Sequence, residues 1–280
     1  MELNYFSPAE VAAIYSDLGV KKAGSPVIKQ FVLAIMAGVF VAFAAQGFNA
    51  AIHTIGSVGI AKTVGGTVFT AALMIVNIAG GELFTGNCLM VIALAEKRIS
   101  AGSLLRSWVV VYIGNLLGCL LIVFFVLHSG QFDFSDGMLG AFTIKTAVYK
   151  STLSFGKAFF LGIMCNTLVC TAMWMAQAAK DIAGKVLAIF FPIWLFVVSG
   201  FEHSIANMYF IPAGILAGLN PVWAAKAANL GVTTEQIAAL GAKSFLLNNL
   251  LPVTLGNLVG GSVLIGFLYW LVYLAKGRSK

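Results

Sequence analysis

Long runs of apolar residues constrain this chain more than any other feature of its sequence. An α-helix needs about 20 mostly apolar residues to cross the hydrocarbon core of a bilayer. Six segments meet this requirement, and they are residues 30–52, 65–95, 104–128, 158–179, 186–218 and 247–275. We therefore expect an all-α membrane protein with six transmembrane helices, joined by short polar links and one longer link at residues 129–156.

The scarcity of charge excludes a soluble domain. Charged residues make up 10% of the 280 positions and the mean hydropathy is +0.96, whereas soluble domains carry about 25% charged residues. The net charge of +7 could suggest a nucleic-acid partner. The basic residues, however, lie between the apolar runs and form no basic patch, so the expected partner is the lipid bilayer and not a nucleic acid.

The basic residues predict the orientation of the spans. Eleven of the 17 lysines and arginines lie on the side that holds both termini, namely Lys21, Lys22, Lys29, Lys97, Arg98, Arg106, Lys180, Lys185, Lys276, Arg278 and Lys280. The other side has Lys62, Lys145, Lys150, Lys157, Lys226 and Lys243. Because cytoplasmic loops carry the excess of Lys and Arg, we expect both termini in the cytoplasm.

The segments outside the spans are short. Residues 1–28 contain Ser7-Pro8-Ala9-Glu10, a capping-box pattern with proline at the first helical position. This predicts a cytoplasmic amphipathic helix at the membrane surface or against a neighbouring subunit. Residues 29–276 form a single channel-like domain, and 277–280 are a cytoplasmic tail. The four cysteines lack metal-ligand spacing, so we expect no metal and no cofactor.

An internal repeat divides the spans into two halves. Lys29-x-Phe31-x-Leu33-x-Ile35-Met36 recurs from Lys157 to Met164, and Gly114-Asn115-Leu116-x-Gly118 recurs from Gly256 to Gly260. Glu82-x4-Asn87 recurs as Glu202-x4-Asn207. Each half holds three spans, an odd number, so the second half enters the membrane from the opposite face. The sequence therefore predicts two inverted three-helix repeats.

Spans 2 and 5 contain clusters of glycine and polar residues at their centres, at residues 80–87 and 199–207. Glycine lowers helix stability by about 1 kcal/mol relative to alanine, which favours a break at each cluster. Unwound backbone at membrane depth is tolerated only inside protein or beside a water-filled cavity. Two matched broken helices therefore indicate a substrate path between the repeats.

Three ionisable residues lie well inside the spans, and they are Glu82, Glu202 and His203. A buried charge costs at least about 2.5–3.5 kcal/mol on insertion scales. The glutamates have two interpretations: they hold the breaks by accepting hydrogen bonds from free amides of the next half-helix, or they contact the substrate. His203 is a candidate pore residue because imidazole exchanges protons near neutral pH.

At these residues the chain resembles the formate/nitrite transporter family. The likeness rests on Gly81-Glu82-Leu83-Phe84-Thr85, on the string from Gly200 to Met208, and on Pro252-Val253-Thr254-Leu255-Gly256-Asn257. The resemblance implies an aquaporin-like protomer in a homopentamer, one pore in each protomer, and a bacterial cytoplasmic (inner) membrane. The substrate implied is a small monovalent anion: formate, nitrite or hydrosulfide. Gly86 follows Thr85 where several formate channels carry serine or threonine, which leaves the anion open.

The resemblance also implies roles for individual residues. At the pore centre, His203 is the central histidine, Thr85 hydrogen-bonds the anion and Asn166 restrains the histidine, with Glu202 and Asn207 beside them. Glu82 and Asn87 support the other break. The apolar residues Leu73, Leu83 and Val169 line one constriction, and Phe69 and Phe196 line the other. Lys150 is an anion-attracting lysine of a vestibule.

These residues suggest a mechanism. An unpaired anion in a low-dielectric constriction costs many kcal/mol, and proton donation from His203 would let the conjugate base of a weak acid cross as a neutral molecule. Two alternatives remain. One is a channel for ammonium or another small neutral solute. The other is a membrane enzyme, which we disfavour because no Gly-x-Ser-x-Gly or His-Glu-x-x-His motif is present.

Overall fold

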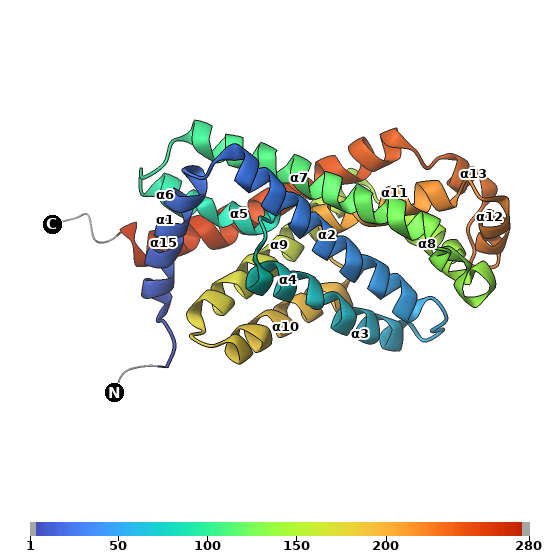
Figure 1. Ribbon diagram of the computed structural model, residues 1–280, viewed down its shortest axis with the longest axis horizontal. Helices are drawn as coiled ribbons and strands as arrows, with labels where there is room; N and C mark the ends of the chain where they lie inside the picture. Colours follow the sequence, from blue (N-terminus) through green and yellow to red (C-terminus); the bar gives the residue numbers. More distant parts are fainter. Residues whose placement is uncertain (1–3, 276–280) are drawn as a thin grey trace.

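The computed structural model describes residues 4–275, and their regular secondary structure is helical apart from an isolated β-bridge between Tyr5 and Ala179 (Figure 1). The predicted tail at 277–280 lies outside the described residues, as do Lys276, Arg278 and Lys280. In chain order the α-helices are α1 Pro8–Ala23, α2 Val27–Ile52, α3 Val58–Phe69, α4 Ala71–Ile75, α5 Phe84–Asn87, α6 Val91–Ala95, α7 Ala101–His128, α8 Phe134–Ser151, α9 Phe155–Ala178, α10 Ile182–Ser199, α11 Ser204–Ala217, α12 Pro221–Ala228, α13 Thr234–Ala238, α14 Leu251–Leu258 and α15 Leu268–Tyr273. Short 3-10 turns occupy Cys88–Met90 and Gln131–Asp133, and π-helical stretches occupy Val76–Gly80, Ser244–Leu250 and Val259–Phe267.

Six helical segments of the described chain are long and apolar enough to cross a membrane, and they are Val27–Ile52, Val58–Gly80, Ala101–His128, Phe155–Ala178, Ile182–Ser199 and Ser244–Tyr273. The predicted six-span, multi-pass membrane protein is confirmed. The second span begins at Val58, seven residues before the predicted start at residue 65. The link at 129–156 is not a plain loop, because most of it forms α8.

Spans 2 and 5 are broken, as predicted. The first half of span 2 ends at Gly80, which has a φ of +95°, and α5 starts at Phe84. The first half of span 5, α10, ends at Ser199, and Gly200 follows with a φ of +74° before α11 starts at Ser204. Positive φ angles cost glycine little. Glycine is therefore the residue that lets each helix stop abruptly inside the bundle.

Each half of the chain packs its first span against its third span through glycines. On α7, an added Cβ at Gly114 would meet Ala34 of α2, and one at Gly118 would overlap the carbonyl oxygen of Ile35. In the second half, an added Cβ at Gly256 of α14 would overlap the carbonyl oxygen of Phe159 of α9. Small residues let membrane helices approach closely. The repeated Gly-Asn-Leu-x-Gly motif is thus the contact surface of both helix pairs.

The α1 helix lies across one end of the bundle, beside α6 and α15 (Figure 1). It begins with the predicted capping box between Ser7 and Glu10. Hydrogen bonds from Ser7 lower the pKa of the Glu10 carboxyl. The carboxylate therefore stays ionised, and the capping box stays intact, until the pH falls to that lowered pKa. The buried side chains of α1, which include Val11 and Tyr15, pack against the chain's own Leu89 and Trp174. This face of α1 is therefore buried within the chain itself, and the placement of the helix at the membrane surface or against a neighbouring subunit stays a prediction.

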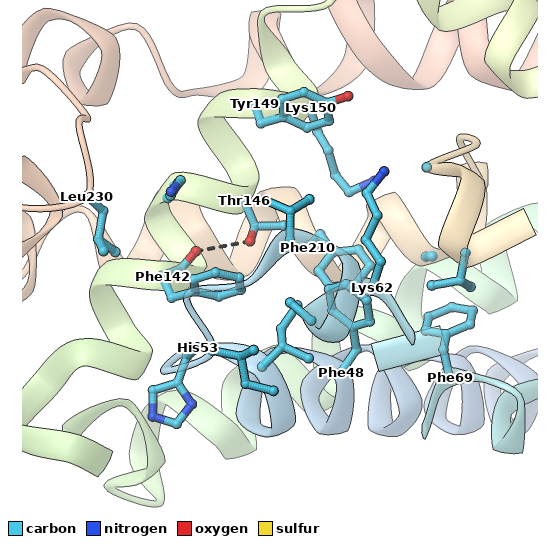
Figure 2. Close-up of a pocket in the computed structure, with 18 of the residues that line it drawn as sticks. Phe48, His53, Lys62, Phe69, Phe142, Thr146, Tyr149, Lys150, Phe210 and Leu230 are labelled. Atoms are coloured by element: carbon cyan, nitrogen blue, oxygen red, sulfur yellow. Dashed lines mark hydrogen bonds between the residues drawn. The ribbon is translucent and has the colours of Figure 1, made fainter. Parts of the chain in front are cut away.

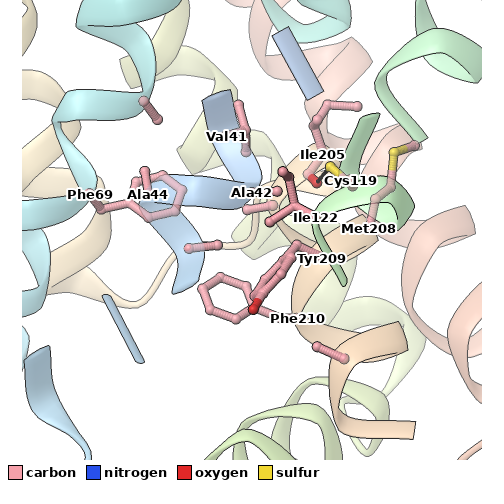
Figure 3. Packing of buried hydrophobic residues seen from close by; sticks show 14 of the residues in the cluster. Val41, Ala42, Ala44, Phe69, Cys119, Ile122, Ile205, Met208, Tyr209 and Phe210 are labelled. Carbon is pink, nitrogen blue, oxygen red and sulfur yellow. Dashed lines mark hydrogen bonds between the residues drawn. The ribbon is translucent and has the colours of Figure 1, made fainter. Parts of the chain in front are cut away.

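The hydrophobic core lies where the two halves meet. Side chains from α2, α7 and α11 interlock there, among them Val41, Ile122 and Met208 (Figure 3). Many core residues are alanine, glycine or cysteine, and all four cysteines are free and buried. The small residues bring the backbones of the breaks close together in the centre of the protein.

Candidate functional site

The break in span 2 is tied to two neighbouring helices by Asn115 of α7. Its Oδ1 accepts a hydrogen bond from the backbone N–H of Phe84 at 3.0 Å. Its Nδ2 donates to the carbonyl of Glu82 at 2.9 Å and to the carbonyl of Ala34 at 2.8 Å. One buried side chain thus satisfies backbone groups on both sides of the gap, which would otherwise be costly at this depth.

The break in span 5 is held in the same way by Asn257 of α14. Its Oδ1 accepts from the N–H of Ser204 at 2.9 Å, and its Nδ2 donates to the carbonyls of Glu202 at 3.0 Å and Gly162 at 2.8 Å. Asn115 and Asn257 occupy the same place in the repeated motif. The two breaks are therefore stabilised by the same arrangement of three hydrogen bonds from a buried asparagine.

Each glutamate accepts a hydrogen bond from the next half-helix, but the donor is a side-chain amide, that of Asn87 or Asn207, while Asn115 and Asn257 bond the free backbone N–H groups. Glu82 Oε2 accepts from Lys22 Nζ at 2.6 Å and from Asn87 Nδ2 at 2.7 Å. Lys22 Nζ also donates to Asn87 Oδ1 at 2.8 Å. The three side chains form a closed ring of hydrogen bonds that anchors the end of α1 to the break.

The second half has a similar cluster with Lys150, but here the lysine ammonium does not bond the asparagine. Glu202 Oε1 accepts from Lys150 Nζ at 2.9 Å, and Glu202 Oε2 accepts from Asn207 Nδ2 at 2.7 Å. Asn249 links Asn207 to the Lys150 carbonyl. Glu202 is 1% exposed, so its charge is balanced by this lysine. Lys150 is consequently the ion-pair partner of Glu202, and its role in attracting anions stays a prediction.

His203 and Thr85 meet at the centre, one from each break. The Nε2 of His203 lies 3.0 Å from Thr85 Oγ1, and the backbone N–H of Ala206 donates to Nδ1 at 3.1 Å. Because an amide can only donate, Nδ1 must be unprotonated in this arrangement. The imidazole is then neutral with its proton on Nε2, and it donates to Thr85. The Thr85 hydroxyl proton is left available for another acceptor.

Asn166 restrains Thr85 and not the histidine ring. Its Nδ2 donates to the Thr85 carbonyl at 3.3 Å and to the Asn257 carbonyl at 2.7 Å. The Cys170 thiol also donates to the Thr85 carbonyl, at 3.3 Å. The position of the threonine, and through it that of His203, is therefore set from the second half of the chain.

Apolar side chains lie on both sides of the His203–Thr85 pair. Phe69 and Phe196 touch edge to face with ring centroids 5.8 Å apart, and the Phe196 ring lies 6.1 Å from the His203 ring. The other predicted constriction residues, Leu73, Leu83 and Val169, are all buried in the same core cluster. The structure thus brings the five predicted constriction residues into the core that surrounds the pair.

A large cavity opens at the end of the bundle away from α1, and we call it the distal vestibule. It has a volume of about 760 Å³ and reaches down to Phe69, Phe196 and His203. Figure 2 shows its aromatic and cationic lining. Lys62, Lys145 and Lys150 contribute three positive charges and Glu202 one negative charge, which gives a formal charge of +2. Such a cavity concentrates anions by electrostatic attraction.

A smaller cavity lies at the other end, under α1, and we call it the proximal cavity. Its volume is about 210 Å³, and Leu83, Asn77, Lys22 and Asn87 contribute to its lining. The two cavities approach the central pair from opposite ends of the bundle. Of the predicted constriction residues, Phe69 and Phe196 line the distal vestibule and Leu83 lines the proximal cavity.

Sequence reasoning missed four residues of this site. Asn115 and Asn257 belong to the Gly-Asn-Leu-x-Gly motif, which indicated the internal repeat and gave the asparagines no role. An asparagine at a matched position inside an apolar span is itself a signal. Lys22 precedes the first span and Lys62 precedes the predicted second span. Nothing in the sequence indicated that either side chain reaches the breaks.

The inverted halves, the paired breaks and the two cavities define a membrane channel or transporter. The chain matches the family model described as formate/nitrite transporter over residues 9–271. The protein therefore belongs to the formate/nitrite transporter family, and this membership favours transport over the alternative of a membrane enzyme.

Relatives and solved structures agree with this assignment. The chain is 39% identical over 274 residues to the formate channel FocA of Escherichia coli strain K12, covering 96% of this chain and 95% of that protein. It is 40% identical to a probable formate transporter of Methanothermobacter thermautotrophicus, with 99% and 100% covered. The fold matches a pentameric formate channel with formate bound at a TM-score of 0.80 and 41% identity, with 89% and 98% covered. An FNT family ion channel matches at 0.78 and 27% identity, with 94% and 98% covered.

Proposed function

We propose that this protein conducts formate through a pore within each protomer. The path runs from the distal vestibule past Phe69 and Phe196 to the His203–Thr85 pair. It continues past the second constriction at Leu73, Leu83 and Val169 to the proximal cavity. The observation that carries the proposal is the central pair itself, which offers hydroxyl and imidazole donors between two apolar constrictions.

The names of the relatives support formate as the principal substrate, since FocA and the solved pentameric channel are formate channels. Nitrite and hydrosulfide are further candidates because, like formate, each is a small monovalent conjugate base of a weak acid. The pentameric neighbour also supports a homopentamer with five independent pores. We place the protein in the bacterial inner membrane with both termini cytoplasmic, following the distribution of basic residues.

The proposed mechanism uses His203 as a proton donor. A neutral imidazole that gave up its Nε2 proton would become an imidazolate, so donation requires prior protonation of Nδ1. The new Nδ1–H would replace the acceptor that now binds the Ala206 N–H. An anion near Thr85 attracts the imidazolium and offsets this loss. The Nε2 proton then passes to the anion, which crosses the apolar constriction as the neutral acid and leaves the imidazole as its neutral Nδ1–H tautomer. Uptake of a proton from water at Nε2 and release of the Nδ1 proton to water restore the starting form, in which Nδ1 accepts from Ala206.

The positive distal vestibule is the observation that separates this proposal from an ammonium channel. A cavity with a formal charge of +2 repels a cation at the entrance. The vestibule charge would neither attract nor repel a neutral solute. Sensitivity of the flux to salt and to substrate charge therefore distinguishes the candidates.

Flux into proteoliposomes tests the proposed function. We expect protein-containing vesicles to take up formate much faster than protein-free vesicles, with slower uptake of methylammonium and of the neutral analogue formamide. Raising the ionic strength should slow formate uptake at low formate concentration, because salt screens the vestibule charge. Equal uptake of formate and formamide, or preference for methylammonium, would contradict the proposal.

A further inference from the structure

The distal vestibule is much larger than the ion that the pore is proposed to conduct. Formate has three heavy atoms, whereas this cavity of about 760 Å³ falls in the range of about 300–1,000 Å³ that holds drug-sized ligands. An entrance that only attracts formate needs positive charge but not a cavity of this volume. The volume therefore raises the question of what else binds there.

The lining combines aromatic rings with cations that have no carboxylate partner. Phe48, Phe142 and Phe210 line the cavity (Figure 2). Lys62 and Lys145 line it too, and the ion pairs formed within residues 4–275 involve neither of them. Their ammonium groups are therefore available to a ligand, whereas Lys150 is neutralised by Glu202.

Lys62 is the better placed of the two. It is half-buried, and its Nζ lies 3.4 Å from the position that a Cβ on Gly200 would occupy. Its charge therefore reaches the break in span 5, directly above the narrow part of the path. Lys145 is exposed. An anionic group bound deep in the vestibule would meet Lys62 first.

The floor of the vestibule is closed to bulky groups. Phe69 and Phe196 pack edge to face with centroids 5.8 Å apart, and each is 4% exposed. A molecule that carries a six-membered ring could enter the vestibule, but it would stop above this contact. A ligand held there would obstruct the entrance.

We propose that the distal vestibule binds monoanions that carry an aromatic ring, and that such ligands block the pore from that side. The carboxylate or sulfonate binds the Lys62 ammonium, and the ring packs among Phe48, Phe142 and Phe210. Apolar pockets with a few placed polar groups bind ligands of this kind, the charge setting the orientation. This inference rests on the proposed function, because the blocked path is the formate path.

Benzenesulfonate is a suitable probe because it stays ionised and does not cross bilayers as a neutral acid. Methanesulfonate keeps the charge without the ring, and benzenesulfonamide keeps the ring without the charge. We expect benzenesulfonate alone to raise the thermal unfolding midpoint of the purified full-length protein in detergent. In proteoliposomes it should inhibit formate uptake in a saturable manner.

The variant Lys62→Gln should raise the half-inhibitory concentration of benzenesulfonate about tenfold, the effect of losing one charge-assisted hydrogen bond. Lys145→Gln should raise it less. Lys243→Gln removes a charge outside the vestibule lining and should leave inhibition unchanged. Equal inhibition of the wild type and Lys62→Gln, or equal potency of benzenesulfonamide, would overturn the inference.

The unfolding measurement separates this inference from the proposed function, since it requires no transport. Stabilisation of the wild type that is lost in Lys62→Gln, together with no formate uptake, would support the binding site and overturn the proposed function. Formate uptake that benzenesulfonate does not inhibit, together with an unfolding midpoint that benzenesulfonate does not raise, would support the proposed function and overturn the binding site.

Discussion

Asn115 and Asn257 each supply three hydrogen bonds to the backbone around a broken helix. Both side chains are fully buried, so water does not replace them. A buried donor or acceptor left without a partner costs about 1–3 kcal/mol. These two residues therefore stabilise the site without touching the proposed path.

Replacing Asn257 with leucine should lower stability strongly. The variant keeps the side-chain size but leaves the Ser204 N–H and the Glu202 carbonyl without their partner, at a cost of at least about 2 kcal/mol. Thermal unfolding in detergent should show a clearly lower midpoint. Asn115→Leu should behave alike, whereas Asn220→Ala, which removes the cap of α12, should cost only about 1 kcal/mol. An unchanged midpoint for Asn257→Leu would contradict the assigned role.

Sequence reasoning found the residues with distinctive chemistry and missed those with long-range partners. His203 and Thr85 were identified from the motifs in the two breaks, although their contact joins residues 118 positions apart. In the sequence Lys22 indicates only orientation, because its hydrogen bond to Glu82 depends on how α1 folds back across the bundle. A lysine's partner is decided by tertiary structure, which no local pattern records.

At the scale of helices, backbone contact at glycine determines how closely the spans approach. A Cβ at Gly118 would overlap a backbone oxygen of α2, and a backbone atom moves less readily than the end of a side chain. The helices must separate to accept it. The same holds for Gly256 against α9.

Gly118→Ala should therefore destabilise the protein by about 1–3 kcal/mol, the usual cost of overpacking. Gly59→Ala is the matched control, because an added Cβ there meets nothing within 4 Å and the residue lies in α3. That control should unfold at the same or a slightly higher temperature. Thermal unfolding of both variants in one detergent makes the comparison, and equal midpoints would argue against the glycine contact.

The six spans were predictable because length and apolar content decide them. The α8 helix was not, because its Asp136, Lys145 and Lys150 made residues 129–156 look like a polar link. Its buried face, which includes Leu139 and Ile144, packs against α11. The early start of α3 at Val58 was hidden by Lys62, which interrupts the apolar run.

For the whole molecule, two oppositely oriented halves bring their breaks to one point. Each half contributes a lysine–glutamate ion pair with an asparagine beside it and the same asparagine tie, but the centre itself is not symmetric. Leu83 stands in span 2 where His203 stands in span 5, directly after the matched glutamates. A single imidazole, with Thr85 as its partner, therefore makes the path a candidate for proton-assisted passage.

The pH dependence of formate uptake by His203→Asn tests this account most directly. Asparagine is a good N-cap, so it can keep the bond from the Ala206 N–H, but it cannot deliver a proton near neutral pH. Uptake would be measured in proteoliposomes from pH 7.5 to pH 5.5, with the rate of protein-free vesicles subtracted. His128→Asn, at the exposed end of α7, serves as the control.

We predict that formate uptake by the wild type and by His128→Asn rises as the pH falls, because more imidazole is protonated. His203→Asn should take up formate slowly and at a rate that does not change with pH. A His203→Asn variant with the rate and the pH profile of the wild type would show that the central imidazole donates no proton to the anion.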